Sequence, residues 1–319
     1  AMCYSAQIQA DYRAYTRLYG AEVSLADFHR LYWQRNQGLR LKIPRGIDAA
    51  FAQPRNAAER AIKALIDAYD ATETTRLEQE VFKQKKRLAD AERRLARKPT
   101  KAAAESRRIA SEKIAWALGK LADLRRSEPA ARDARIFPGW YAPVMVMERG
   151  RRIVRPMRYQ CRPAGKPASF DVRFPGTYNA RRDNLEGFWR EQFGHCRALL
   201  CIQAFYENVS RHAMEHRPLA PGEADENVVL EFRPRPAHDM LVACLWSHWQ
   251  HDDETLDSFA AITDAPPADI AAAGHDRCIV PIKAAHTDAW LDPDSHPLPA
   301  LQAILDDREP MHYVHRLAA

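Results

Sequence analysis

Tyr178-Asn-Ala-Arg181 and, after a short helical spacer, Arg197-Ala-Leu-Leu-Cys-Ile-Gln-Ala-Phe-Tyr-Glu207 are the stretches that decide the fold. Residues 199–206 are almost wholly apolar and end in aromatic residues, which favours an interior strand over a helix. Glu207 is then expected where a buried strand meets the surface, a position at which desolvation can raise a carboxyl pKa. A solvated glutamate at the end of a strand is the simpler alternative.

Two further marks accompany these stretches. Cys3 directly follows Met2, and His275-Asp276-Arg277 follows the strand-like segment 259–263. The marks and their order resemble the SOS-response-associated peptidase family, which includes abasic-site processing proteins that crosslink to damaged single-stranded DNA. The resemblance spans the chain outside roughly 45–135, and it implies a DNA-damage enzyme.

Cys3 carries the reactive groups that this resemblance implies. Once Met2 is removed, one carbon would bear both an α-amine and a thiol-bearing side chain. An α-amine has a pKa near about 7.7–8.0, so part of it is neutral and nucleophilic at physiological pH. The amine forms an imine with an aldehyde, and the thiolate then closes a thiazolidine ring. We therefore expect single-stranded DNA with an abasic site as the substrate, and no cofactor.

The resemblance also implies supporting roles. His275 is expected as general acid–base, and Glu207 as the group that takes the amine proton or steers the imine. Asn179 can hold the Cys3 backbone or the sugar oxygen. A guanidinium is always charged and binds bidentately, which suits flanking phosphates. The residues expected to contact DNA are Arg181 and Arg277 first, followed by Arg158, Tyr159, Arg190, Arg197 and Thr263.

Some positions leave alternatives open. Tyr4-Ser5 stands where the family has Gly-Arg, and Asn208 where an aromatic residue is usual. Tyr4 can stack on a neighbouring base, which is worth about 1–3 kcal/mol, or it can narrow the pocket. For Arg197, an ion pair at the edge of the core is as compatible with the sequence as a DNA contact.

The composition is that of a globular protein, with 46% hydrophobic and 28% charged residues in a chain of 319. No apolar run approaches the roughly 18 residues that span a bilayer, and no signal-peptide pattern is present, so we expect a cytoplasmic, nucleoid-associated protein without a membrane partner. Ala1 is set aside from functional reasoning. The net charge of +6 favours an anionic partner.

Residues 57–126 differ sharply in composition from their surroundings, since glycine and proline nearly vanish. Residues that are apolar except for Gln84 alternate steps of four and three from Leu77 to Leu95 and again from Ala110 to Leu124, on either side of Pro99-Thr100. The pattern predicts an antiparallel coiled-coil arm over 57–128, inserted into a catalytic domain formed by 2–56 and 129–319. Its lysines and arginines are densest near Pro99; a solvated face, nucleic-acid contact and a protein partner all remain open.

The rest of the chain predicts an α+β fold with a mostly antiparallel β core and short flanking helices. A helix is expected over 7–19, a second over 24–33, and short ones over 287–291 and 299–307. The expected strands are 142–147, 152–159, 228–232, 240–249, 259–263 and 278–282.

His212-Ala-Met-Glu-His216 has the order of an inverted zinc-peptidase motif. Pro218 and Pro221-Gly222 follow at once, which disfavours the long helix that such a site needs, and no other metal site is indicated. Two alternatives to the crosslinking enzyme remain. One is an autoprocessing cysteine peptidase, and the other is a non-catalytic module that binds DNA or a partner through the basic arm.

Overall fold

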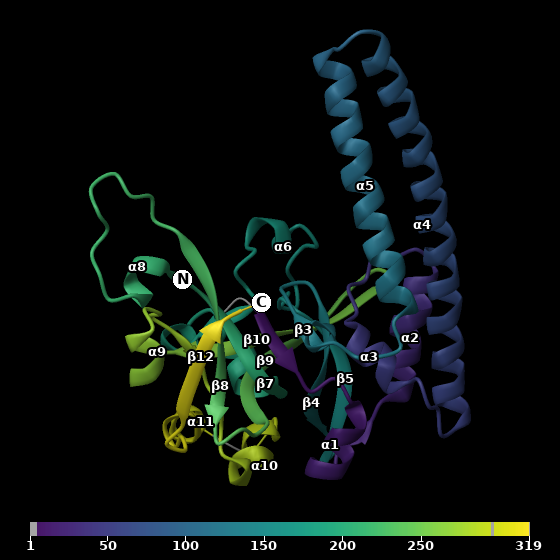
Figure 1. Ribbon diagram of the computed structural model, residues 1–319. Coiled ribbons are helices and arrows are strands. Elements are labelled where there is room, and N and C mark those ends of the chain that lie inside the picture. The colour runs from purple at the N-terminus through teal and green to yellow at the C-terminus, as the bar shows by residue number, and fades with distance from the viewer. Residues whose placement is uncertain (1–4, 295–296, 319) are drawn as a thin grey trace. The chain divides into compact units, whose positions relative to one another are not determined.

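The computed structural model describes residues 5–294 and 297–318. Cys3 and Tyr4 lie outside the described residues. The chain divides into two compact units, one made of residues 1–31, 40–53 and 130–319 and the other of 32–39 and 54–129. The first unit holds a β core and the second a helical hairpin (Figure 1). Within the described ranges, no helix is both long and apolar enough to cross a membrane.

The β core is one mixed sheet with a barrel-like shape, to which the described residues contribute twelve strands. Among the strands of the described residues most neighbours are antiparallel, and the pairs β10–β5, β10–β6 and β2–β5 are parallel. The predicted α+β class is confirmed. The strands are β1 (Ser5–Ile8), β2 (Glu22–Val23), β3 (Arg135–Ile136), β4 (Tyr141–Glu148), β5 (Arg151–Tyr159), β6 (Asn179–Arg181), β7 (Arg197–Ser210), β8 (Asn227–Arg235), β9 (Met240–His251), β10 (Glu254–Asp264), β11 (Cys278–Ile279) and β12 (His312–Leu317).

β7 is the strand around which this sheet is organised. Residues 197–202 pair with β9, residues 205–210 pair with β8, and β1 runs along the other edge with Ser5 opposite Tyr206. Consecutive residues of β7 are buried on both faces of the sheet, which is why its apolar run is continuous. The strand continues to Ser210, so Glu207 lies inside it and is fully buried. The expectation of a strand-end carboxylate at the surface is therefore wrong, because β8 extends the pairing past Glu207.

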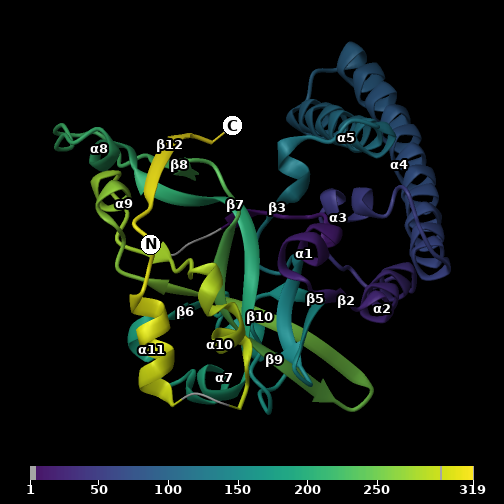
Figure 2. The same cartoon turned by 90° about the horizontal axis from the view of Figure 1, so that it is seen from below.

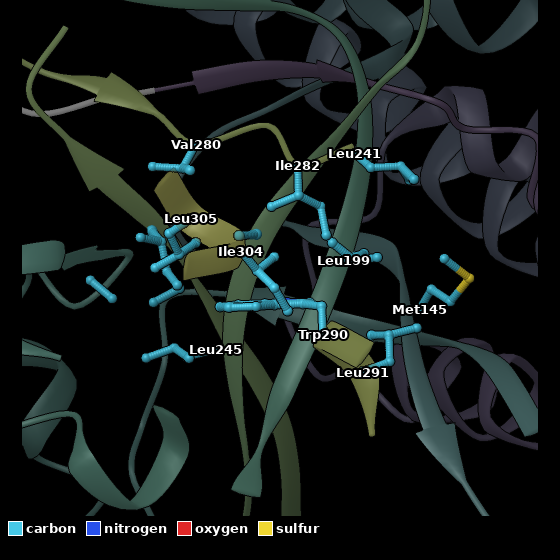
Figure 3. Packing of buried hydrophobic residues seen from close by; sticks show 14 of the residues in the cluster. Met145, Leu199, Leu241, Leu245, Val280, Ile282, Trp290, Leu291, Ile304 and Leu305 are labelled. Carbon is cyan, nitrogen blue, oxygen red and sulfur yellow. The ribbon is translucent and has the colours of Figure 1, made fainter. Parts of the chain in front are cut away.

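Short helices close the core. They are α1 (Tyr12–Tyr19), α2 (Leu25–Asn36), α3 (Arg45–Ala50), α6 (Phe170–Arg173), α7 (Arg190–His195), α8 (Arg211–Met214), α9 (Ala268–Ala272), α10 (Thr287–Leu291) and α11 (Leu298–Asp306), with single 3-10 turns at Ala131–Ala134, Arg182–Asn184 and Ala284–His286. Trp290 of α10 packs near Leu199 of β7 and Leu305 of α11 (Figure 3). Its indole Nε1 donates to the Ala198 carbonyl at 2.9 Å, so the ring is both buried and hydrogen-bonded.

The N-terminal helix is shorter than the predicted 7–19. Residues 5–8 form β1 because β7 offers their backbone a ladder, which no local helical pattern reveals. The helix begins at Tyr12, where the Asp11 carboxylate caps the Arg13 amide at 3.0 Å, and it ends at Gly20, whose positive φ of 61° suits glycine.

The helical unit contains α4 (Ala57–Arg97) and α5 (Lys101–Arg125), which run antiparallel (Figures 1 and 2). Asn56 caps α4 and Thr100 caps α5, with Pro99 between the helices. Leu77 and Val81 pack against Ala117 and Leu121 to form a narrow apolar strip. The two helices therefore coincide with the periodic segments of the sequence.

Candidate functional site

Glu207 and His275 form a buried pair in the β core. The imidazole Nε2 lies 3.2 Å from the Glu207 Oε2, and both side chains are almost completely buried, with exposures of 1% and 0%. Removing two ionisable groups from water is costly unless each stabilises the other. The pair is therefore a place where small movements of a proton change the charge in a poorly solvated space.

His275 reaches Glu207 through a sharp turn after α9. Gly274 has a φ of 91°, and a Cβ at this position would lie 3.2 Å from the Cβ of Ala213 in α8. α8 and α9 lie side by side in both views (Figures 1 and 2). Glycine therefore permits the turn and the close approach that direct His275 toward the sheet. The His275 amide donates to the Ile270 carbonyl at 3.3 Å, which fixes the turn.

The hydrogen bonds of His275 define its tautomer. Its Nδ1 lies 2.7 Å from the Arg277 carbonyl oxygen and 3.3 Å from the Arg277 amide nitrogen. The carbonyl can only accept, so the shorter contact favours a hydrogen on Nδ1, and Nε2 faces Glu207. Burial lowers the pKa of His275 below its ordinary value of 6.5, and the bond to the Arg277 carbonyl opposes that shift. The lowered pKa favours the neutral imidazole, whose Nε2 can accept a proton, as general acid–base chemistry requires.

Asn179 is held by an aromatic cluster. The Tyr159 hydroxyl donates to the Asn179 Oδ1 at 3.4 Å, and the Tyr159 ring stacks on Phe259 with 5.2 Å between centroids. Asn179 belongs to β6, whose register places it opposite Ala261 of β10. Tyr159 and Ala261 line a small cavity together with Ser5. The predicted residues Tyr159 and Asn179 thus lie together, close to the N-terminal strand.

Arg181 and Arg277 converge on one carboxylate, that of Asp183. Arg181 lies 2.5 Å from it and Arg277 3.6 Å. The pKa of Asp183 is lowered, mainly by the hydrogen bond from Arg181. Asp183 was not singled out in the sequence, although its position two residues after Arg181 is a usable signal. Any phosphate bound by these two guanidinium groups competes with Asp183.

The lower-ranked DNA residues have different surroundings. Thr263 is buried in β10, opposite Arg181 of β6 in register. Arg158 is partly buried and forms an ion pair with Asp171 at 2.8 Å. Arg190 begins α7 and is exposed. Of these three residues, only Thr263 lies opposite a residue of β6, the strand that carries Arg181.

Arg197 is a structural residue rather than a strand-lining one. It is 1% exposed, and its guanidinium donates to the Trp290, Phe193, Gly194 and Asp292 carbonyls. These bonds occupy the group, so a DNA phosphate has no access to it. The four acceptors that the structure shows are all backbone carbonyls, so hydrogen bonds rather than an ion pair hold this guanidinium among the described residues. The sequence could not show this, since two of the acceptors, Trp290 and Asp292, lie 93 and 95 residues further along the chain.

The cysteines of the described segments are poor nucleophiles. Burial raises the thiol pKa of each, to about 12 for Cys161 and Cys201 and well above the usual value for Cys278, where Glu207 adds to the effect. Cys196 and Cys244 are raised for the same reason. Across the residues that the structure describes, no cluster of three or more His, Cys, Asp or Glu side chains is arranged to hold a metal ion.

A polar network beside the start of the chain was missed in the sequence. Arg135 of β3 donates to the Ser5 hydroxyl at 3.1 Å and lies 3.7 Å above the Tyr206 ring. The Tyr206 hydroxyl in turn donates to Glu231 at 3.1 Å. β3 is only two residues long and lies far from β7 in the sequence, so no local pattern could reveal this arrangement.

Residues 95–316 match the family described as SOS response associated peptidase (SRAP). The chain belongs to this family. The SRAP family supports a function related to DNA damage, in agreement with the resemblance seen in the motifs. The matched residues include Asn179, Glu207 and His275 but begin after Cys3.

Several solved structures are similar to this SRAP protein. A protein from Bordetella bronchiseptica is 17% identical with a TM-score of 0.47, and the match covers 61% of this chain and 90% of that one. A protein from Bacteroides thetaiotaomicron is 15% identical with a TM-score of 0.47, and the match covers 58% of this chain and 78% of that one. A phage-related protein from Bordetella bronchiseptica is 19% identical with a TM-score of 0.43, and the match covers 60% of this chain and 85% of that one. No curated protein matches the chain.

Proposed function

We propose that this SRAP protein forms a covalent crosslink between Cys3 and an abasic site in single-stranded DNA. The observation that carries the proposal is the buried Glu207–His275 pair beside the N-terminal strand. Ser5 lies opposite Tyr206, the residue before Glu207. Only Tyr4 separates Cys3 from Ser5, and two residue steps span at most about 7 Å, a length that allows the Cys3 amine and thiol to reach the pair.

The chemistry needs proton transfer at each step. The Cys3 α-amine attacks the C1′ aldehyde of the open sugar, and loss of water gives an imine. The thiol sulfur then adds to the imine carbon while its proton passes to nitrogen, which closes a thiazolidine with one water lost overall. His275 and Glu207 supply and remove these protons, and Asn179 orients the sugar or the Cys3 backbone. Arg181 and Arg277 bind flanking phosphates after displacing Asp183.

Denaturing gel electrophoresis tests the proposal. Protein that begins at Cys3 is incubated with single-stranded DNA carrying one abasic site, and a band that resists denaturation is expected. Its mass should equal protein plus DNA less one water. Cys3→Ala should abolish the band, whereas Cys196→Ala is the matched control and should retain it. An undiminished band from Cys3→Ala would refute the crosslink.

The same buried pair also supports a second function, the autoprocessing peptidase. In this case Glu207 and His275 would assist the Cys3 thiol in releasing Met2. Intact-mass measurement after expression distinguishes the two: Met2 should be lost from the wild type and kept by Glu207→Gln. Equal loss from both proteins would leave Met2 removal to a general aminopeptidase and would exclude self-processing.

A further inference from the structure

The helical arm concentrates positive charge to an unusual degree. Residues 81–113 contain twelve lysines and arginines and four acidic residues, a net charge of +8. The whole chain carries +6, so the remaining residues together carry −2. The attraction of this protein for polyanions therefore resides in the distal half of the hairpin rather than in its surface as a whole.

Most of this charge has no internal partner. In the segment, Arg93 pairs with Asp90, and Arg108 pairs with Glu105 and Glu112. Among the described residues, the other ten cations have no ion pair: Lys83, Lys85, Lys86, Arg87, Arg94, Arg97, Lys98, Lys101, Arg107 and Lys113. Crowded like charges repel one another, so a bound polyanion stabilises this surface.

Part of this positive charge lines a groove between α4 and α5. The groove has a volume of about 250 Å³, and four cations and one carboxylate line it together with Ala91, Ala103 and Ser106. The two alanines are buried, so the floor is formed by small side chains that allow a ligand to approach closely. Arg87 Nε donates to the Ser106 hydroxyl at 3.0 Å, which holds one guanidinium at the rim. The four cations are Lys83, Lys86, Arg87 and Arg94.

Exposed large hydrophobic side chains are scarce on this surface, which narrows the class of ligand that it can bind. The exposed large hydrophobic residues of the hairpin are Phe82, Trp116 and Leu118. Phe82 lies at the start of the surface, before its first cation, and the described residues 83–115 hold no other. Single-strand binding relies on several aromatic side chains that stack on successive bases, and stable protein interfaces rely on buried apolar anchors. A cationic surface with a single aromatic side chain at one end fits the backbone of a duplex better, since a duplex offers one charge per about 1.7 Å of helix axis.

We infer that the distal half of the arm, residues 81–113, is a binding surface for the phosphodiester backbone of duplex DNA, read without regard to sequence. From Lys83 to Arg97 α4 rises about 21 Å, enough to face several phosphates of one strand. The surface is independent of Cys3 and of the abasic site. Its role is to retain the protein on DNA while the β core meets a damaged single strand.

Fluorescence anisotropy with the full-length protein and an unmodified duplex of about 30 base pairs tests this inference. The triple variant Lys83→Gln, Lys86→Gln, Arg94→Gln removes three groove charges but keeps good helix formers and the Arg87–Ser106 bond. Binding at about 50 mM salt should weaken by at least about 10-fold, and the slope of log K against log salt should become shallower by about 3. Circular dichroism verifies that the helices remain.

The matched control removes three exposed charges from the arm outside residues 81–113, through Arg60→Gln, Arg76→Gln and Lys120→Gln. It should bind within about twofold of the wild type, since it lacks no groove contact. Equal weakening by both variants would refute the surface. So would tighter binding to a single strand of the same length, or no duplex binding at low salt, which would favour an acidic protein partner. Because the DNA is undamaged, none of these outcomes bears on the Cys3 crosslink.

Discussion

The β core and the helical arm place their charged residues in opposite environments. In the core, Glu207 and His275 are withdrawn from water and held against each other by strands and turns that are distant in sequence. In the arm, lysines and arginines extend into solvent, where salt screens them over about 8–10 Å. Desolvated groups suit bond-making steps that need controlled protons, whereas solvated charges suit reversible attraction. The comparison teaches that charge alone does not identify a reactive site.

The strongest test of the core removes the acidic member of the pair. Glu207→Gln keeps the shape of the side chain but removes its ability to take a proton, so the crosslinking rate should fall by about 10²–10³-fold. Glu231→Gln is the control, because it changes a buried carboxylate on the neighbouring strand that binds Arg233 instead of His275. Single-turnover rates decide the matter, and comparable losses in both variants would contradict a special role for Glu207.

A second test concerns the buried cation of the core. Arg197→Met should lower the free energy of unfolding by about 3 kcal/mol, because four carbonyl acceptors lose their donor. Arg190→Met, on the exposed start of α7, should change it by less than about 0.5 kcal/mol. Urea denaturation measures both. If Arg197→Met proved stable but bound DNA poorly, the structural role assigned to Arg197 would be wrong.

Removing the charge of Asp183, which lies between Arg181 and Arg277, should improve DNA binding by a smaller factor than the preceding variants impair the protein. Asp183→Asn should tighten binding of undamaged single-stranded DNA by about 3–10-fold, because it removes the anion that competes for Arg181 and Arg277. Asp288→Asn, which releases Arg152 elsewhere on the β core, serves as the control. Anisotropy titrations compare them. Unchanged affinity in Asp183→Asn would remove these arginines from the DNA-binding surface.

The burial of His275 should also make the stability of the protein depend on pH. Its pKa is lowered in the folded state by burial, so the unfolded chain binds the proton first as the pH falls. The contribution is therefore favourable above the unfolded pKa of about 6.5 and is lost progressively below it. Melting temperatures from pH 8 down to pH 5 should fall less steeply in His275→Gln than in the wild type. Parallel curves would contradict the lowered pKa.

The smallest effect on the crosslinking rate is expected when the arm is removed. Replacing residues 57–128 by a short Gly-Ser linker should leave the crosslinking rate at saturating DNA within about twofold, while weakening DNA association at low salt. Rates and binding at two salt concentrations give the two readouts. Loss of crosslinking in a folded deletion variant would mean that the arm contributes to the active site and that the separation of chemistry from attraction is incorrect.

Local patterns predicted much of the fold. The strands 142–147 and 152–159 and the helix 287–291 agree with β4, β5 and α10, because alternation and turn residues are local signals. β1, β3 and β6 were not predicted as strands. Each is at most four residues long and exists because a partner strand offers hydrogen bonds. The helical reading of residues 7–11 failed for the same reason.

The candidate site shows the same division. Asn179, Glu207 and His275 were identified from short motifs, but their burial and pairing were not. Glu207 was expected at the surface because its strand was expected to end there. Arg197 was ambiguous because its four acceptors lie in segments 193–194 and 290–292. Asp183 and Arg135 were missed because their contacts with Arg277 and with Ser5 and Tyr206 exist only in the folded protein.

The sequence by itself determined the arm and the residues that mark the family. A helix satisfies its own backbone hydrogen bonds and repeats its apolar side every three to four residues, so α4, α5 and the charge between residues 81 and 113 can be predicted locally. Only the tertiary structure decided that His275 faces Glu207 at 3.2 Å and that both are buried. That contact depends on β7 pairing with β8 and on the turn at Gly274, which join residues 68 positions apart in the chain. Burial, and with it proton chemistry, is a property of the assembled sheet.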